Sequence, residues 1–228
     1  MESCWLHHNQ ANRCLLFLAG WGMDPGPFQG IPAKECDVLL VYDYNQLTGL
    51  DLEAIAAYQE IHLLAWSMGV WVAAHLFQPP ELQGRFTSST AIGGTLEPIH
   101  PSLGIPPASY QQILDSFSAS TLAAFQDSMF TQEAERQRFL AHPPKRSLDN
   151  VQAELAAFQA HYQRFGAAAD IFSHKLVTSR DRVFPLKNQL RAWSKQASTI
   201  LKLPHFPFYA LQGWQELIPT PVENETTL

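Results

Sequence analysis

The sequence predicts an α/β protein with a mostly parallel central sheet, and three observations support this prediction. Short apolar runs, each long enough for one buried strand, alternate with segments of helical apolar spacing. The runs are nearly continuous, which is typical of strands that are covered on both faces. Glycines and prolines separate them. The alternation of strand and helix therefore favours a parallel sheet with helices on both faces.

The expected elements follow this order along the chain. Residues 1–12 have only a weak strand signal, and the first clear run, "CLLFLAGWG", predicts a strand and a tight turn. Strands are expected at residues 14–22, 36–44, 60–67, 86–94, 174–181 and 198–204. Helices are expected at residues 51–58, with Asp51 as N-cap, at 68–77 before two prolines, at 186–196 and near 209–217.

The strand pattern is interrupted once, and the interruption predicts the domain organisation. Residues 97–169 have apolar residues spaced by three or four and no strand signal, so we expect a helical lid insertion. The core is then formed by residues 1–96 and 170–218. The polar segment 219–228 is expected to be a disordered tail.

Composition and charge exclude several classes of protein. No apolar run reaches the roughly 20 residues of a membrane span, and the start lacks the pattern of a signal peptide. The cysteines (Cys4, Cys14 and Cys36) lack metal-site spacing, so reduced thiols, a cytoplasmic location and no metal or cofactor are expected. The net charge of −6 disfavours nucleic acid as a partner. No membrane partner is expected either, and the chain is expected to be a monomer.

The charge is unevenly distributed along the chain. Residues 1–130 hold three basic residues against twelve acidic ones, whereas residues 131–202 hold twelve basic residues against six acidic ones. A basic region in an acidic protein could dock an acidic partner. A solvated, Arg-rich helix face is the alternative.

A serine stands where the third clear strand passes into a helix, in "LLAWSMGVW". This is the setting of a nucleophile elbow, in which small residues two before and two after the serine relieve crowding. Here those residues are Ala65 and Gly69, so the usual Gly-x-Ser-x-Gly pattern is met in part. Ser67 alone fits a nucleophile and a helix N-cap equally well.

An activated serine needs a histidine base and a carboxylate, in the chain order serine, acid, histidine for this type of elbow. Asp181 follows the strand "KLVTSR", and His205 follows the strand "STILKLP". The carboxyl ends of parallel strands share one edge of the sheet, where ligand sites of such folds lie. Ser67, Asp181 and His205 are therefore the predicted triad. A turn aspartate and a loop histidine are the alternatives.

The oxyanion of an acyl-transfer intermediate needs two backbone donors. One is expected from Met68, the residue after the nucleophile, and the other from Trp21 in the turn "AGWG". A plain tight turn is the alternative interpretation of this glycine-rich segment.

These residues together resemble the α/β-hydrolase family, and more closely the BioG-type pimeloyl-[acyl-carrier protein] methyl ester esterases of biotin synthesis. The resemblance covers "FLAGWGMD", "VYDY", "AWSMGVW", "SRDRVF" and the "HFPF" that contains the base. Ala65, unusual for hydrolases generally, fits this group. The resemblance implies a serine esterase that frees the pimeloyl carboxylate, with Ser67 attacking, His205 transferring protons and Asp181 orienting the imidazole.

The resemblance also implies substrate and partner contacts. "RFLA" resembles a substrate-contacting stretch of the BioH-type lid, which predicts that Phe139 lines the acyl channel together with Trp21; a buried lid-core phenylalanine is the alternative. The expected partner is an acidic acyl-carrier protein, for which a basic lid would be complementary. The candidate docking residues are Arg136, Arg138, Lys145, Arg146 and Arg164. A thioesterase, a short-chain carboxylesterase and a non-catalytic binding module remain alternative functions.

Overall fold

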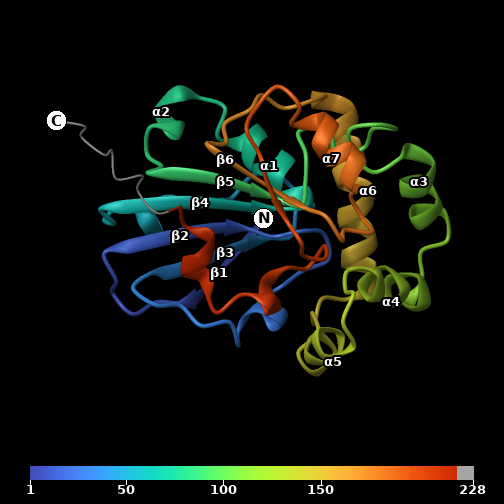
Figure 1. The fold of residues 1–228 in the computed structure, drawn as a ribbon, viewed down its shortest axis with the longest axis horizontal. Coiled ribbons are helices and arrows are strands. Elements are labelled where there is room, and N and C mark those ends of the chain that lie inside the picture. Colours follow the sequence, from blue (N-terminus) through green and yellow to red (C-terminus); the bar gives the residue numbers. More distant parts are fainter. Residues whose placement is uncertain (220–228) are drawn as a thin grey trace.

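The computed structural model describes residues 1–219, and its centre is a seven-stranded sheet (Figure 1). The strands are β1 (Glu2–His7), β2 (Arg13–Leu18), β3 (Asp37–Tyr42), β4 (Glu60–Trp66), β5 (Ser88–Ile92), β6 (His174–Thr178) and β7 (Thr199–Leu201). They lie in the order β1-β3-β2-β4-β5-β6-β7. Only the edge pair β1·β3 is antiparallel among them. The predicted mostly parallel sheet is confirmed.

Helices lie on the sheet and beside it. The α-helices are α1 (Met68–Leu76), α2 (Pro80–Gln83), α3 (Pro107–Asp115), α4 (Ala119–Ser128), α5 (Glu133–Ala141), α6 (Leu148–Phe165) and α7 (Leu186–Ala192). Single turns of 3-10 helix are η1 (Gly26–Phe28), η2 (Glu53–Ile55), η3 (Phe208–Ala210) and η4 (Trp214–Leu217). The helices expected after the serine and after the "SRDRVFP" segment are therefore present as α1 and α7.

The near-continuous apolar strands are buried on both faces, as their composition requires. In β2, Leu16 and Leu18 pack in the cluster that contains α1 and α6, whereas Phe17 packs in the cluster on the opposite face. There its ring lies 5.2 Å from Phe28 and 5.0 Å from Trp214, between ring centroids. The single turns η1, η3 and η4 and the segments around them thus cover this second face, in place of long helices.

Four α-helices, α3 to α6, occupy the chain between β5 and β6, where the sequence indicates an insertion. Figure 1 shows them grouped beyond one end of the sheet, with α6 nearest to the strands. The strand pairing in this stretch of the described chain is an isolated bridge between Ile99 and Ile105. The name helical insertion is used below for residues 97–169.

Two of the predicted helices are absent, and one observed strand was only weakly indicated by the sequence. At 51–58 the structure has the single turn η2, because the Asp51 carboxylate accepts the Glu53 amide at 2.9 Å in a local turn and no α-helix follows. At 209–217 the structure has η3 and η4, separated by Gly213 with its φ of 164°. The weak segment 1–12 forms β1, whose edge position leaves its residues half-exposed.

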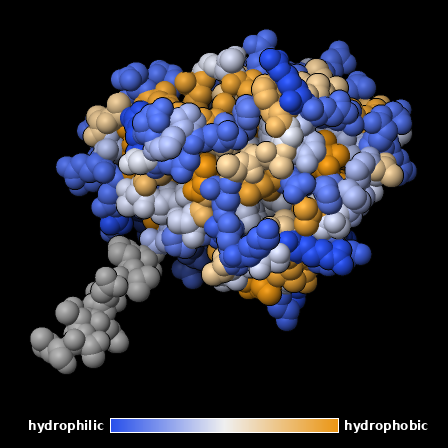
Figure 2. Space-filling view, turned by 90° about the horizontal axis from the view of Figure 1, so that it is seen from above, coloured by the Kyte–Doolittle hydropathy of each residue, from blue (hydrophilic) through white to orange (hydrophobic). Residues whose placement is uncertain are grey.

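On the face drawn in Figure 2, polar side chains surround several small apolar areas. The exposed large apolar residues are spread over four elements: Leu140, Leu148, Phe165, Leu190 and Ile200. No helix within residues 1–219 combines the length and the apolar character that a membrane crossing needs. Of the predicted disordered tail, all but residue 219 lies outside the described residues.

Candidate active site

Ser67 occupies a strained turn between β4 and α1. Its φ of 59° and ψ of −125° lie outside the regions that a non-glycine residue normally adopts. Such a conformation costs about 1–3 kcal/mol and persists only where the surroundings impose it. The Ser67 amide donates to the Ile92 carbonyl at 3.1 Å, which holds the turn against β5. The Ser67 side chain makes no capping hydrogen bond to α1, so this serine does not act as a side-chain N-cap.

The residues around this turn explain the pattern of small side chains. A Cβ on Gly69 would lie 2.4 Å from the Leu18 carbonyl oxygen, and one on Gly94 would lie 2.2 Å from the Ser67 carbonyl oxygen. Both positions therefore exclude any side chain. Ala65 is fully buried in β4, paired with Leu18 and Ala91, and its methyl group packs in the core beside α1. The site thus tolerates a methyl group two residues before the serine but none two residues after it.

The predicted serine, histidine and aspartate lie in one hydrogen-bonded chain. His205 Nε2 is 3.0 Å from Ser67 Oγ, and His205 Nδ1 is 2.8 Å from Asp181 Oδ2. The three residues follow β4, β6 and β7, whose carboxyl ends share one edge of the sheet. All three are buried: Ser67 is 4% exposed, Asp181 9% and His205 1%. The geometry is the one that proton transfer from the hydroxyl to the imidazole requires.

The Asp181 carboxylate is held from several sides. Its Oδ1 accepts the backbone amides of Val183 and Phe184 at 2.7 and 2.8 Å. Its Oδ2 accepts the Thr178 hydroxyl at 2.8 Å and the Gln189 side-chain amide at 3.3 Å, in addition to His205. Because every partner donates, the carboxylate has one orientation, with Oδ2 directed at the imidazole.

The imidazole of His205 is positioned by its own backbone and by aromatic rings. The Trp66 indole donates to the His205 carbonyl at 2.7 Å, and the Phe206 amide donates to the Met129 carbonyl at 3.1 Å. The Phe184 ring stacks on the imidazole, with 6.0 Å between centroids and 11° between planes. These contacts fix the position and the plane of the imidazole ring between Asp181 and Ser67.

The two amides expected to bind an oxyanion flank the serine. Met68 is the first residue of α1, and the first amides of a helix have no intrahelical acceptor. Trp21 lies in the turn after β2, and its backbone amide donates to no protein atom in the described part of the chain. A Cβ on Gly20 would lie 3.1 Å from the Ser67 Cβ, so this turn passes directly beside the serine. Both amides are thus available at the same side chain.

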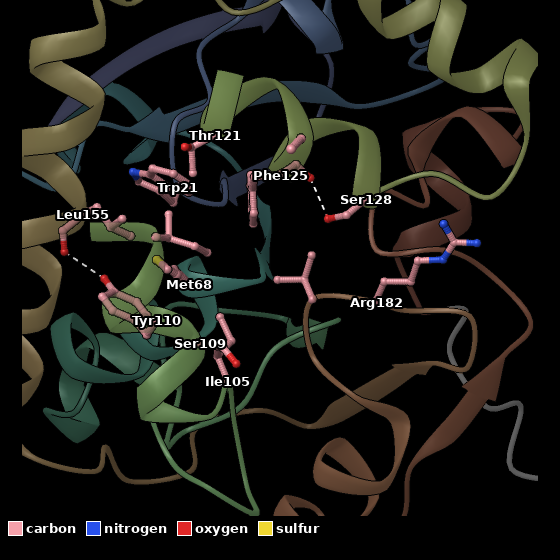
Figure 3. Close-up of a pocket in the computed structure, with 13 residues that line it drawn as sticks. Trp21, Met68, Ile105, Ser109, Tyr110, Thr121, Phe125, Ser128, Leu155 and Arg182 are labelled. Carbon is pink, nitrogen blue, oxygen red and sulfur yellow. Dashed lines mark hydrogen bonds between the residues drawn. The ribbon is translucent and has the colours of Figure 1, made fainter. Parts of the chain in front are cut away.

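A cavity of about 310 Å³ opens beside these amides, between the sheet edge and the helical insertion (Figure 3). In Figure 3 the rings of Trp21 and Phe125 lie beside Met68, while the Arg182 guanidinium points away from them. Most of the lining side chains are apolar: the residues are Trp21, Met68, Ile105, Ser109, Tyr110, Ile113, Thr121, Ala124, Phe125, Ser128, Leu155, Arg182 and Val183. Ser67 does not itself line the cavity, but the next residue, Met68, does. An apolar wall beside the serine suits an acyl chain whose carbonyl is presented to the hydroxyl. Within the described residues no group of His, Cys, Asp and Glu side chains is arranged to hold a metal ion.

Phe139 does not line this cavity. It is 1% exposed, and its ring lies 5.2 Å from Phe130 and 5.6 Å from Phe206, between centroids. The prediction that it lines the acyl channel is therefore wrong for this structure, and the core alternative holds. An apolar residue on an amphipathic helix gives the same sequence pattern in both cases. Phe139 supports the site indirectly, because Phe206 is the residue after His205.

The five basic residues considered for docking do not form one surface. Arg146 is buried: its guanidinium pairs with Glu154 at 2.7 Å and lies 3.2 Å from Asp43. Arg164 is at the far end of α6, whose 18 residues span about 27 Å from the end near Arg146. Arg146 is therefore unavailable to a partner, because its charge is already neutralised inside the protein.

The other three basic residues lie on or after α5. Arg136 is engaged by Asp127 at 2.7 Å and Glu133 at 3.2 Å. Arg138 is exposed and lies 4.2 Å from the Tyr209 ring centroid, without an acidic partner among the described residues. Lys145 is exposed too. Arg164 is likewise exposed, so Arg138, Lys145 and Arg164 are the members of the set without an acidic partner among the described residues, and Arg138 donates to the Gly30 carbonyl at 2.9 Å.

Sequence reasoning missed the residues that support the site through long-range contacts. Gln189 of α7 binds Asp181, and Glu154 of α6 accepts the Gly22 amide at 2.9 Å, next to Trp21. Tyr110 and Leu155 line the cavity. The sequence signal for these residues was helical periodicity, which predicts a buried face but not what that face contacts.

Comparison with known proteins shows the family to which the chain belongs. A family model described as "Pimeloyl-ACP methyl esterase BioG" matches residues 1–217. A malonyl-[acyl-carrier protein] O-methyltransferase from Bacteroides fragilis (strain 638R) is 34% identical over 186 residues, which are 82% of this chain and 37% of that longer protein. An uncharacterized protein from Haemophilus influenzae is 33% identical over 212 residues, 91% of this chain and 95% of its own length.

Solved structures add the fold. A crystal structure of BioG from Haemophilus influenzae superposes with a TM-score of 0.84 and 31% identity, covering 95% of this chain and 99% of that one. The type II thioesterase YbtT of yersiniabactin biosynthesis has a TM-score of 0.62 at 17% identity, covering 92% and 93%. A lipase-esterase related protein from Clostridium acetobutylicum has a TM-score of 0.61 at 11% identity, covering 90% of this chain and 92% of that one. The last two similarities show the α/β-hydrolase fold alone. The chain is a carboxylic ester hydrolase and belongs to the BioG family of pimeloyl-ACP methyl esterases.

Proposed function

We propose that this chain hydrolyses the methyl ester of pimeloyl-[acyl-carrier protein] methyl ester through an acyl-enzyme on Ser67. The observation that carries the proposal is the chain of hydrogen bonds from Ser67 through His205 to Asp181, at 3.0 and 2.8 Å, beside an apolar cavity. A polymethylene chain with an ester at its end fits such a cavity, because apolar walls bind the chain and the ester reaches the hydroxyl.

The chemistry follows from the positions of the groups. Ser67 Oγ attacks the ester carbonyl carbon while its proton passes to His205 Nε2, and the Trp21 and Met68 amides bind the oxyanion. The intermediate collapses, the C–O bond to the methoxy group breaks, and the imidazolium protonates the leaving group to give methanol. Water then attacks the acyl-enzyme carbonyl while its proton passes to His205. The bond to Ser67 Oγ breaks as the imidazolium returns the proton to Oγ, and the free carboxylic acid leaves and ionises. Asp181 keeps Nδ1 protonated and stabilises the imidazolium throughout.

The decisive experiment compares the two bonds that this substrate offers. With pimeloyl-[acyl-carrier protein] methyl ester we expect methanol release to exceed release of the carrier thiol at least about tenfold. Methanol is measured by gas chromatography and free thiol by its reaction with a chromogenic disulfide, with Ser67→Ala as the blank. Faster thiol release would indicate a thioesterase. Release of neither product, together with no activity on a p-nitrophenyl ester, would indicate a binding module.

The carrier contact is the second part of the proposal, and Arg138 is the residue that supports it best. Its charge is exposed, and α5 packs through Phe139 on the residue that follows His205. Charge reversal, Arg138→Glu, is expected to raise KM for the carrier-bound ester about threefold to tenfold, because a charge at a docking rim steers association. Arg164→Glu, the same change at the far end of α6, is the matched control.

The measurement is KM for the carrier-bound ester and for a small free ester, at low and high salt. Added salt should shrink the effect of Arg138→Glu, since exposed charges are screened. An equal change of KM for both esters would contradict a carrier contact, as would equal effects of the two reversals. Monomeric state and cytoplasmic location, both expected from the sequence, remain predictions.

A further inference from the structure

We propose that Glu154 is a positioning residue for the oxyanion site, through which helix α6 of the helical insertion sets the direction of the Trp21 amide. The inference deepens the proposed function and rests on it. It gives the insertion a part in catalysis beyond covering the cavity. The residue itself touches neither the substrate nor the reacting atoms.

The Glu154 carboxylate binds two loops at once. It is 1% exposed, its Oε2 accepts the Gly22 amide at 2.9 Å and its Oε1 accepts the Tyr44 amide at 2.8 Å. These amides belong to the loops that follow β2 and β3. The Gly22 N–H lies in the peptide plane that joins Trp21 to Gly22, so the bond to α6 fixes the plane directly after the one that carries the Trp21 N–H.

The same helix grips the Trp21 side chain. The indole Nε1 donates to the Val151 carbonyl at 2.8 Å, one helical turn before Glu154. Gly22 has a φ of 73°, and a Cβ there would lie 3.3 Å from Val151 Cγ1. The turn is thus held to α6 by its backbone, by its indole and by close packing. The Trp21 amide itself donates to no atom of the described residues, and its neighbour Gly20 lies beside Ser67.

The charge at Glu154 argues for a role beyond filling the core. Burial raises the pKa of this carboxyl, while the Arg146 guanidinium at 2.7 Å and the two backbone amides oppose that rise. A buried ion pair is often less stabilising than apolar side chains of the same size. A carboxylate, however, can accept two backbone amides that an apolar residue would leave unsatisfied. The pair is therefore suited to fixing the geometry of the two loops.

The arrangement links acyl binding to the oxyanion donors. Leu155, the residue after Glu154, lines the cavity, as does Trp21 (Figure 3). The acyl chain and the turn that carries one oxyanion donor thus contact the same stretch of α6. An intermediate with its charge at the oxyanion site gains from this placement, whereas a bound ground-state ester gains little.

Glu154→Gln tests the inference, because an amide has one oxygen and cannot accept at both ends. One of the two loops then faces an NH₂ group. We expect kcat for a p-nitrophenyl ester to fall about 10- to 100-fold, less than the 10²- to 10³-fold typical of losing an oxyanion donor outright. KM should stay within about threefold. The Ki of a trifluoromethyl ketone, which forms a tetrahedral adduct on serine, should rise by the same factor as kcat falls.

Asn150→Ala is the matched control on the same helix. Asn150 lies one turn before Glu154, accepts Arg146 Nε at 2.7 Å and donates to Asp43 at 3.2 Å, and within the described residues it makes no hydrogen bond to the turn after β2. We expect it to lower the Tm about as much as Glu154→Gln, while kcat and Ki stay within about threefold of the parent. Glu154→Asp keeps the charge for Arg146 and decides the matter if the glutamine variant does not fold: its shorter carboxylate should lower kcat with KM unchanged.

The outcomes separate two failures. If kcat and Ki of a folded Glu154 variant match the parent, or if Asn150→Ala loses as much kcat, Glu154 only stabilises the fold and the inference is overturned. If Ser67→Ala keeps full activity, the proposed mechanism itself fails, whatever Glu154 does.

Discussion

Ser67→Ala is expected to lower kcat for ester hydrolysis about 10⁶-fold, with the fold intact. The alanine removes the only oxygen within hydrogen-bond distance of His205 Nε2 among the described residues, so covalent catalysis is lost completely. The strain at φ 59° is retained by alanine, so the Tm should change little. The measurement is the initial rate with a p-nitrophenyl ester, with circular dichroism to verify folding.

The members of a catalytic triad act as a unit, so the proposed triad gives a second expected result. His205→Ala should cost about as much as Ser67→Ala, and the double variant no more than either, because losses within a triad are not additive. The residual rate reports the oxyanion amides and substrate binding alone. Activity of Ser67→Ala within tenfold of the parent would refute the serine mechanism.

Asp181→Asn is expected to lower kcat about 10⁴-fold while leaving KM nearly unchanged. The asparagine oxygen can keep the Val183 and Phe184 amides, so its NH₂ group faces His205 Nδ1. Because an NH₂ group donates, His205 Nδ1 must accept, and the imidazole proton then lies on Nε2. A protonated Nε2 cannot accept the proton of the serine hydroxyl.

The matched control is Asp115→Asn, an exposed aspartate at the end of α3 whose side chain accepts Gln111. It makes the same chemical change away from the site, so kcat should remain within about twofold of the parent. The measurement is kcat and KM for both variants at one pH. A loss in Asp181→Asn that is no larger than that of the control would exclude Asp181 as the orienting acid.

The candidate triad could be found from sequence because each of its members comes within a few residues of the end of a strand. Parallel strands bring their carboxyl ends to one edge, so Ser67, Asp181 and His205 converge without any knowledge of the loops. The expected strands β2, β3 and β4 are present because a strand covered on both faces has a nearly continuous apolar run.

The helices of the helical insertion could be predicted from the sequence, but the contacts that their side chains make could not. Glu154 looks like any acidic residue of an amphipathic helix, and its partner Gly22 is 132 residues away. Phe139 and Leu155 have the same apolar character, yet one is packed among aromatic rings and the other lines the cavity. Periodicity gives the buried face of a helix, whereas the choice between core and cavity depends on how the helices are packed together.

The proposed base, His205, lies in a segment without α-helix or strand. From residue 202 to 219 the chain has only the single turns η3 and η4, and Phe206 and Phe208 hold it by ring contacts with Phe28. Segments with few backbone hydrogen bonds open locally at a lower free energy than sheets do. Detachment of this segment would withdraw His205 while the seven strands stay paired. We therefore expect esterase activity to be lost on heating below the temperature at which the sheet melts, which activity and circular dichroism measured side by side would test.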